Sequence, residues 1–265
     1  MKQRILKKMK DSGIQWIGQI PKEWKVIKFK YSFNIVGGNG FPDSLQGNET
    51  GDYPFCKVSD INGGSDYVEK AQNYVTKKIV SDHNFNVIPI NSIIMSKIGI
   101  ALMKNHRKIN TVECCIDNNT QALIPRRCDN LKYLFYLSKL LDMKWFDNNG
   151  TIPSINNSKL LNFFVPDIDI TVQTRIASFL DQKCLAIDSV LEKTKASIEE
   201  YKKLKLSVIA EAVTGKLNIG AEWQDLGYRA QGAERNGNIL ANENLSHNRH
   251  CCISQSISYI LVPNY

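Results

Sequence analysis

Two aspartates and a lysine in the second half of the chain follow the PD…DxK order of many metal-dependent nucleases. Asp167 comes directly after a proline, and Asp181 is followed two residues later by Lys183. In those nucleases the carboxylates and the lysine converge from adjacent strands on one Mg²⁺. Here Asp181 and Lys183 fall within an expected helix, where residues two apart point to different sides. The three side chains are therefore not expected to converge, and the pattern does not predict a nuclease.

Cysteines and histidines form no metal-binding pattern of familiar spacing. The seven cysteines include the adjacent pairs Cys114–Cys115 and Cys251–Cys252 but no C-x-x-C, and only His247 and His250 are close among the four histidines. Adjacent cysteines do not easily ligate one zinc. An odd number of cysteines without a secretory signal favours reduced thiols in a cytoplasm. We expect small buried side chains, with a structural metal as the alternative.

The usual catalytic motifs are absent from the sequence. It has no G-x-x-x-x-G-K-[ST] loop, no G-x-S-x-G elbow and no Gly-rich dinucleotide fingerprint. The stretch 36–43, VGGNGFPD, lacks the lysine and the following helix of a phosphate loop, so it predicts a turn. No run of about 18 apolar residues exists that would span a membrane. These motifs therefore give no indication of a catalytic site.

The charge of the chain is the first positive indication of a partner. The formal net charge is +8, and residues 1–30 hold nine Lys or Arg against Asp11 and Glu23. Such an excess suits a polyphosphate such as nucleic acid or an anionic membrane surface. A basic face that only keeps the protein soluble is the alternative.

The elements that would position polar residues belong to a mixed α+β domain. Short β-rich runs alternate with turn sequences between residues 26 and 165, and one segment has helical periodicity before Gly150 and Pro153. Few helices among several strands, without regular alternation, indicate α+β. The β-rich runs are 53–61, 86–103 and 120–126, and the helical segment is 130–146.

A long helix follows this domain. Asp169 is a plausible N-cap, and no Pro or Gly interrupts the chain from Ile170 until Gly215, which suits the C′ position. Steps of three and four residues define a seam that argues for a coiled coil of ~65 Å, at 1.5 Å per residue. A long helix lying across its own domain is the alternative. The seam consists of Ala177, Leu180, Cys184, Ile187, Leu191, Thr194, Ile198, Tyr201, Lys205, Val208 and Ala212.

We therefore divide the chain into a globular α+β domain at 1–166, a coiled-coil helix at 167–216 and a tail at 217–265. The tail is rich in Asn, Gly, Ser and Gln and has no clear periodicity. Such a composition predicts weak order.

Five stretches together resemble the DNA-specificity subunit of type I restriction–modification enzymes. Their order and spacing carry the resemblance, which covers residues 9–216, and no single motif would suffice. The stretches are 9–30 (MKDSGIQWIGQIPKEWKVIKFK), 51–63 (GDYPFCKVSDING), 91–123, 148–166 (NNGTIPSINNSKLLNFFVP) and 174–216.

In that family the specificity subunit does no chemistry. It typically holds two target-recognition domains, each followed by a conserved helix, and the helices pack antiparallel as a spacer between two half-sites of a split DNA sequence. It carries methyltransferase subunits that use S-adenosylmethionine, and restriction subunits that need ATP and Mg can join. The resemblance therefore implies a cytoplasmic subunit that binds double-stranded DNA and has no cofactor of its own.

The chain departs from the family pattern after Lys216, where a second recognition domain should begin. It looks like one half of a specificity subunit. Two interpretations stay open: a half-subunit that reads one half-site and pairs with a copy of itself or another half, or a truncated remnant that pairs through its helix without binding DNA.

The resemblance assigns DNA contacts to polar residues in the family-like stretches. Lysines would bind phosphate groups. Arg107 could also donate two hydrogen bonds to the edge of a guanine, and asparagines could hydrogen-bond to adenine. Ser59 and Asp60 could read a cytosine or a backbone oxygen. The full set of expected contacts is Lys57, Ser59, Asp60, Lys97, Lys104, Asn105, Arg107, Lys108, Asn118, Asn119, Thr151, Ser154 and Asn156.

Two groups of apolar residues could serve protein partners. On the helix we expect Leu180, Ile187, Leu191, Ile198, Tyr201 and Val208 to pair with a second helix. In the N-terminal arm, Trp16 and Trp24 could dock against a partner helix or a methyltransferase subunit. Packing within the chain is the equal alternative for the two tryptophans.

Overall fold

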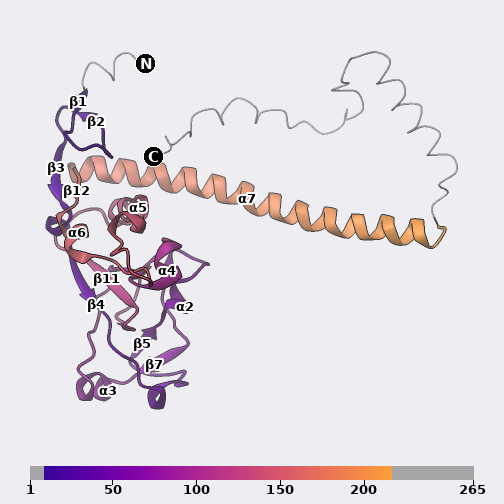
Figure 1. Ribbon diagram of the computed structural model, residues 1–265, viewed down its shortest axis with the longest axis horizontal. Coiled ribbons are helices and arrows are strands. Elements are labelled where there is room, and N and C mark those ends of the chain that lie inside the picture. Colours follow the sequence, from indigo (N-terminus) through magenta and orange to yellow (C-terminus); the bar gives the residue numbers. More distant parts are fainter. Residues whose placement is uncertain (1–8, 217–265) are drawn as a thin grey trace. The chain divides into compact units, whose positions relative to one another are not determined.

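The computed structural model describes residues 9–216 (Figure 1). The predicted tail at 217–265 lies outside the described residues. The strands are β1 (Met9–Asp11), β2 (Gln19–Pro21), β3 (Lys25–Lys28), β4 (Phe33–Gly37), β5 (Tyr53–Cys56), β6 (Tyr67–Val68), β7 (Asn73–Val75), β8 (Ile93–Ser96), β9 (Arg107–Asn110), β10 (Cys115–Ile116), β11 (Thr120–Pro125) and β12 (Phe164–Asp167). The helices are α2 (Val58–Ile61), α3 (Lys77–Asp82), α4 (Gly99–Met103), α5 (Leu131–Leu140), α6 (Asn157–Asn162) and α7 (Ile170–Val213), with 3₁₀ turns η1 (Phe29–Tyr31), η2 (Asp43–Leu45) and η3 (Met143–Phe146).

A five-stranded sheet is the centre of the recognition domain. Its strands lie in the order β4-β11-β8-β9-β6, and only the β6–β9 pair is parallel. A three-stranded sheet, β10-β5-β7, and the pairs β1-β2 and β12-β3 complete the strands of the described region. Mixed sheets without regular βαβ units confirm the predicted α+β class.

Two hydrophobic clusters cover the opposite faces of this sheet. Ile93 and Met95 on β8 face the larger cluster, while Ile94 faces the smaller one, as the two-residue period of a strand requires. The larger cluster includes Phe29, Phe33, Phe135, Phe146 and Leu160, so α5, α6 and the 3₁₀ turns cover that face. The smaller one includes Cys56, Ile61, Cys114 and Ile116.

The buried cysteines behave as the expected small apolar side chains. Cys56, Cys114 and Cys115 are buried and reduced, whereas Cys128 is exposed and Cys184 is half-buried. Burial raises the pKa of Cys115 to about 12, so its thiol stays protonated at neutral pH.

Three predicted elements are shorter than their sequence patterns. The run 53–61 is a strand only to Cys56, because the Asp60 carboxylate accepts the Lys57 N–H at 2.7 Å and starts α2. The run 86–103 breaks at Gly99, whose φ of +73° ends the extended backbone before α4. The helical segment 130–146 ends α5 at Leu140, and Asp142 caps the separate turn η3.

Both predicted ends of the long helix are confirmed. The Asp169 carboxylate accepts the Thr171 N–H at 2.7 Å, and these hydrogen bonds lower the pKa of Asp169. At the other end Gly215 has a φ of +70°, and the Lys216 N–H donates to the Glu211 carbonyl at 2.9 Å. This is a Schellman motif, which only a residue that tolerates left-handed φ closes easily. The 44 residues of α7 span ~66 Å at 1.5 Å per residue.

Buried polar contacts fix the first turns of α7 to the compact unit, which ends at Ile187. The buried Gln173 side chain accepts the Asn130 N–H at 2.7 Å and donates to Asp129 at 2.8 Å. About two turns further on, the Tyr136 hydroxyl donates to Asp181 at 2.6 Å. Residues from Asp188 onward form a separate unit.

The N-terminal tryptophans pack within the chain. The Trp16 indole stacks on Phe163 with ring centroids 5.3 Å apart, and its Nε1–H donates to the Phe164 carbonyl at 3.0 Å. Trp24 packs against the larger cluster. Of the two roles considered for this pair, the structure supports internal packing.

Candidate nucleic-acid interface

One end of the five-stranded sheet brings together loops that are far apart in sequence. Because the strands are antiparallel, the end of β4 at Gly37 pairs with β11 at Gln121, and Thr120 pairs with Ser96 at the end of β8. The start of β9 at Arg107 lies beside Met95. We call the segments 37–39, 97–106 and 117–119, which continue from these strand ends, the loop edge.

Backbone hydrogen bonds hold the loop edge as a rigid unit. The Lys97 N–H donates to the Asn119 carbonyl at 2.9 Å, and the Asn39 N–H donates to the Ile116 carbonyl at 2.9 Å. Gly38 approaches so closely that an added Cβ would lie 2.0 Å from the Asp117 carbonyl oxygen. The sequence pattern VGGNGFPD predicted a turn but gave no sign of this close approach.

Two further segments join the loop edge. The loop before α6 is attached by the Gly99 N–H, which donates to Pro153 at 2.7 Å, and by the Ile155 N–H, which donates to Lys97 at 3.0 Å. The Asp117 N–H donates to the Cys56 carbonyl at 3.0 Å, and this hydrogen bond places the next residue, Lys57, beside the loop edge. Burial raises the pKa of Asp117, while its hydrogen bonds and Lys57 oppose that shift.

Twelve of the thirteen expected DNA contacts are exposed or half-exposed, and Arg107 is buried. Ser59, Lys104, Asn118, Asn119 and Thr151 are exposed, and Lys57, Lys97 and Lys108 are half-exposed. The Lys57 ammonium donates to Gln46 at 2.6 Å and lies 5.3 Å from the Phe41 ring centroid. The loop edge therefore presents amides and ammonium groups on a backbone that is already fixed.

The expectation that Arg107 reads a guanine is wrong. Its side chain is only 3% exposed, and its guanidinium donates to both oxygens of Asn105, at 2.7 and 2.8 Å, and to the Leu141 carbonyl at 3.1 Å. Burial lowers its pKa to about 10, so it stays charged at neutral pH. The Asn105 side chain also makes contacts within the fold, since its amide donates to the Lys139 carbonyl at 3.1 Å. Both residues hold the end of α5 against β9, and the buried Arg107 guanidinium does not reach a base.

Three more expected contacts serve the fold. Asp60 caps α2, and Asn156 caps α6 by accepting the Lys159 N–H at 2.9 Å. The Ser154 hydroxyl accepts from the Asn148 amide at 3.1 Å. Cap and turn positions favour the same short polar side chains as DNA contacts do, and the sequence alone does not separate the two roles.

Comparison with known proteins identifies the family. Residues 21–200 match the type I restriction modification DNA specificity domain. The chain belongs to this family. The fold of a type I specificity subunit thus accounts for the mixed recognition domain and the long helix that follows it.

This chain spans about half the length of the relatives that it matches. The MjaIX specificity subunit of a type I restriction enzyme from Methanocaldococcus jannaschii is 26% identical over 201 residues, which are 72% of this chain and 44% of that subunit. A solved chain from the complex assembly of a type I R-M system has 18% identity and a TM-score of 0.58, covering 80% of this chain and 50% of that one. The HsdS subunit from Thermoanaerobacter tengcongensis has 18% identity and a TM-score of 0.52, covering 82% and 50%.

The nuclease-like residues of this specificity domain do not form a metal site. Asp167 pairs with Arg127 at 2.8 Å, whereas Asp181 accepts from Tyr136 and lies 3.7 Å from Lys132. Residues 9–216 hold no cluster of three or more His, Cys, Asp or Glu that could bind a metal. Within the same residues, no helix is long and apolar enough to cross a membrane.

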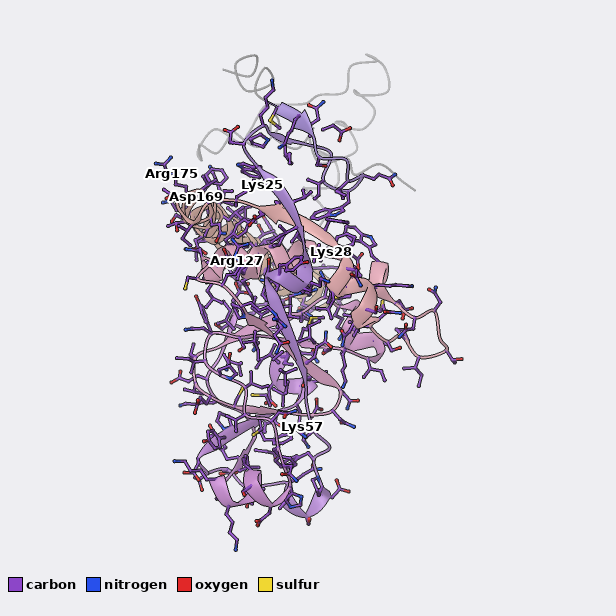
Figure 2. All side chains as sticks on the ribbon, turned by 90° about the vertical axis from the view of Figure 1, so that its left-hand side faces the viewer. Lys25, Lys28, Lys57, Arg127, Asp169 and Arg175 are labelled. Atoms are coloured by element: carbon purple, nitrogen blue, oxygen red, sulfur yellow. The ribbon has the colours of Figure 1, made fainter. Side chains whose placement is uncertain are left out.

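A second group of basic residues was predicted only in part, since Lys25 belongs to the basic excess of residues 1–30 but Arg127 and Arg175 were not singled out. Figure 2 shows Lys25, Arg127 and Arg175 near Asp169, toward the opposite end of the view from Lys57. The adjacent arginines Arg126 and Arg127 were the available signal, but they follow a strand and precede a helix with no other sign of function.

Proposed function

We propose that this chain reads one half-site of a split DNA sequence as the specificity subunit of a type I restriction–modification system. The observation that carries the proposal is the placing of three lysines and two exposed asparagines at or beside the loop edge, from segments about 60 residues apart. A fixed backbone lowers the conformational cost of binding.

The side chains divide between positioning and reading. Lys57, Lys97 and Lys104 would bind phosphates, which position the domain on the duplex. Asn118 and Asn119 could hydrogen-bond to the N6 and N7 edge of adenine in the major groove. Ser59, Lys108 and Thr151 are additional candidates for backbone contacts.

The helix would supply the partner interface. Leu180 is half-buried beside the compact unit, whereas the rest of the expected pairing residues are exposed, with Ile187 at 57% and Leu191 at 50%. We infer that a second copy of this chain, or a second specificity half, pairs with α7. Methyltransferase subunits that use S-adenosylmethionine and ATP- and Mg-dependent restriction subunits would join this pair in the cytoplasm.

A charge reversal at the loop edge tests DNA reading. We expect Lys97→Glu to weaken binding to a duplex selected from a random pool by at least tenfold, because a phosphate contact becomes a repulsion. The salt dependence of the affinity should also become shallower. Fluorescence anisotropy with excess competitor duplex measures both effects.

Lys203→Glu on α7 is the matched control, with the same charge change away from the loop edge. Equal losses for Lys97→Glu and Lys203→Glu would contradict the loop edge as the DNA site. If no duplex is enriched by selection, the chain is instead an assembly remnant. Methyl transfer or DNA cleavage by the purified chain alone would contradict the non-catalytic role.

A further inference from the structure

Two isoleucines from segments far apart in sequence lie exposed beside the loop edge. The side chain of Ile100 is 77% exposed and that of Ile152 is 63% exposed. The Gly99 N–H donates to the Pro153 carbonyl at 2.7 Å, and the residues next to these two form an antiparallel β-bridge. Ile100 and Ile152 continue this pairing by one position on either side. They therefore lie close together on the surface, and we call them the isoleucine pair.

The exposure of Ile100 is not a consequence of loose packing. Its short helix α4 buries Leu102 in the larger hydrophobic cluster and packs Met103 against the same cluster. Ile100 is left outside this contact. The Lys104 N–H donates to the Ile100 carbonyl at 3.2 Å, so the two side chains share one face of the turn. An exposed ammonium group thus lies beside an exposed apolar side chain.

Ile152 lies near the tip of a loop whose base is fixed by hydrogen bonds. The Ser154 N–H donates to the Asp147 carboxylate at 2.8 Å, and the Asn148 N–H donates to the Ser154 carbonyl at 2.9 Å. The Asn156 amide donates to the Asn148 side chain at 2.9 Å. Because the base of the loop is already ordered, its tip loses little conformational freedom on binding.

The charges around the isoleucine pair complement a polyanion. The segments 97–106 and 148–156 contain no Asp or Glu, and the first of them contributes Lys97 and Lys104. Asp117, the one acidic residue of the loop edge, is buried. The Asp147 carboxylate, at the base of the loop, accepts a backbone N–H. Apolar side chains flanked by lysines, without exposed acids in these segments, suit a stack of bases between two phosphate chains.

We infer that the isoleucine pair is an apolar wedge that enters the base stack of the bound duplex and kinks it. The inference rests on the proposed reading of a half-site. Proteins that bend DNA insert side chains such as Ile, Leu and Phe between base pairs, and the bent duplex contacts more protein surface in return. Lys97 and Lys104 would bind the phosphates beside the opened step.

The wedge implies a sequence preference at a step that no side chain reads by hydrogen bonds. Pyrimidine–purine steps such as TA and CA unstack most easily, whereas runs of adenine are stiff. We therefore expect the half-site to contain or adjoin a pyrimidine–purine step. Replacing that step with AA should weaken binding by about fivefold or more, and the preference should disappear when both isoleucines are replaced by serine.

Unstacking can be measured with the purified full chain and a duplex selected from a random pool. In that duplex 2-aminopurine replaces each adenine in turn, because its fluorescence rises when it loses its stacking neighbours. We expect the wild-type chain to raise the fluorescence at one step by about threefold or more. Ile100→Ser and Ile152→Ser should each remove about half of this rise or more, and the double variant should abolish it. Using the chain alone excludes base flipping by a methyltransferase subunit.

Ile90→Ser is the matched control, since Ile90 is 52% exposed and precedes β8 at the end opposite the loop edge. It should keep the full rise in fluorescence. Ile100→Leu, which retains an apolar side chain of equal size, should keep most of it. All these variants should unfold at the wild-type urea concentration, because the replaced side chains are exposed. A double variant with an unchanged rise, or an equal loss in Ile90→Ser, would overturn the wedge.

The outcomes separate the wedge from the reading of a half-site. A selected duplex that binds tightly without a rise at any adenine would overturn the wedge alone. A rise on unselected duplexes, with no sequence enriched, would contradict the half-site reading alone. Isoleucine variants that unstack DNA like the wild type but no longer bind a methyltransferase subunit would show that the pair docks a protein, which also overturns the wedge.

Discussion

Gly38→Ala is expected to lower the free energy of unfolding by about 3–5 kcal/mol, because the new methyl group would overlap fixed backbone. The Cβ would lie 2.0 Å from the Asp117 carbonyl oxygen and 2.3 Å from that of Ile116. Neither oxygen belongs to a flexible side chain that could turn away. Urea denaturation followed by circular dichroism measures the change.

Gly40→Ala, two residues away, is the matched control. No atom lies within 4 Å of its added Cβ, and its φ is not in the left-handed region. We expect a change of less than about 1 kcal/mol there, with a slight gain possible through the unfolded state. Similar losses of unfolding free energy for Gly38→Ala and Gly40→Ala would contradict this explanation. They would show that the close approach of Gly38 to residues 116–117 is not the cause of the destabilisation. Gly38→Ala should also abolish specific DNA binding, because it displaces the loop edge.

Arg107→Met is expected to cost about 2–4 kcal/mol of stability, because it leaves buried acceptors without donors. Methionine retains much of the apolar volume, so the loss reports mainly on the three hydrogen bonds to Asn105 and Leu141. Thermal and urea unfolding measure it. The variant should not change base preference, which distinguishes a structural arginine from a reading one.

Lys108→Met, at the next position of β9, is the control because its side chain is half-exposed. We expect a stability change within about 0.5 kcal/mol. An Arg107→Met protein that keeps full stability but binds altered duplexes would contradict the structural role and restore the guanine-reading hypothesis.

The sequence predicted the elements whose signals are local. Asp169 and Gly215 mark the ends of α7 because caps depend on side chains and φ angles within one turn. The α+β class followed from the spacing of strands and turns. Apolar patterns alone did not predict where the runs 53–61 and 130–146 break. Capping hydrogen bonds of Asp60 and Asp142 end the regular element in each run.

The candidate site was predicted only in part, because its geometry depends on long-range pairing. Lys97 and Asn119 are joined by a backbone hydrogen bond that sequence spacing does not encode. Arg107 has the residue type of a base-reading side chain, but its position on β9 points it beneath α5.

The unequal burial of the cysteines makes the pairing of α7 observable with a thiol-reactive dye. Cys56, Cys114 and Cys115 are buried in the interior, where the dye does not reach them. Among residues 9–216 the accessible thiols are Cys128, which is exposed, and Cys184, which is half-buried on the predicted seam of α7. In a chain with Cys251 and Cys252 replaced by serine, maleimide labelling of Cys184 should slow as protein concentration rises, which gives an association assay that needs no introduced cysteine.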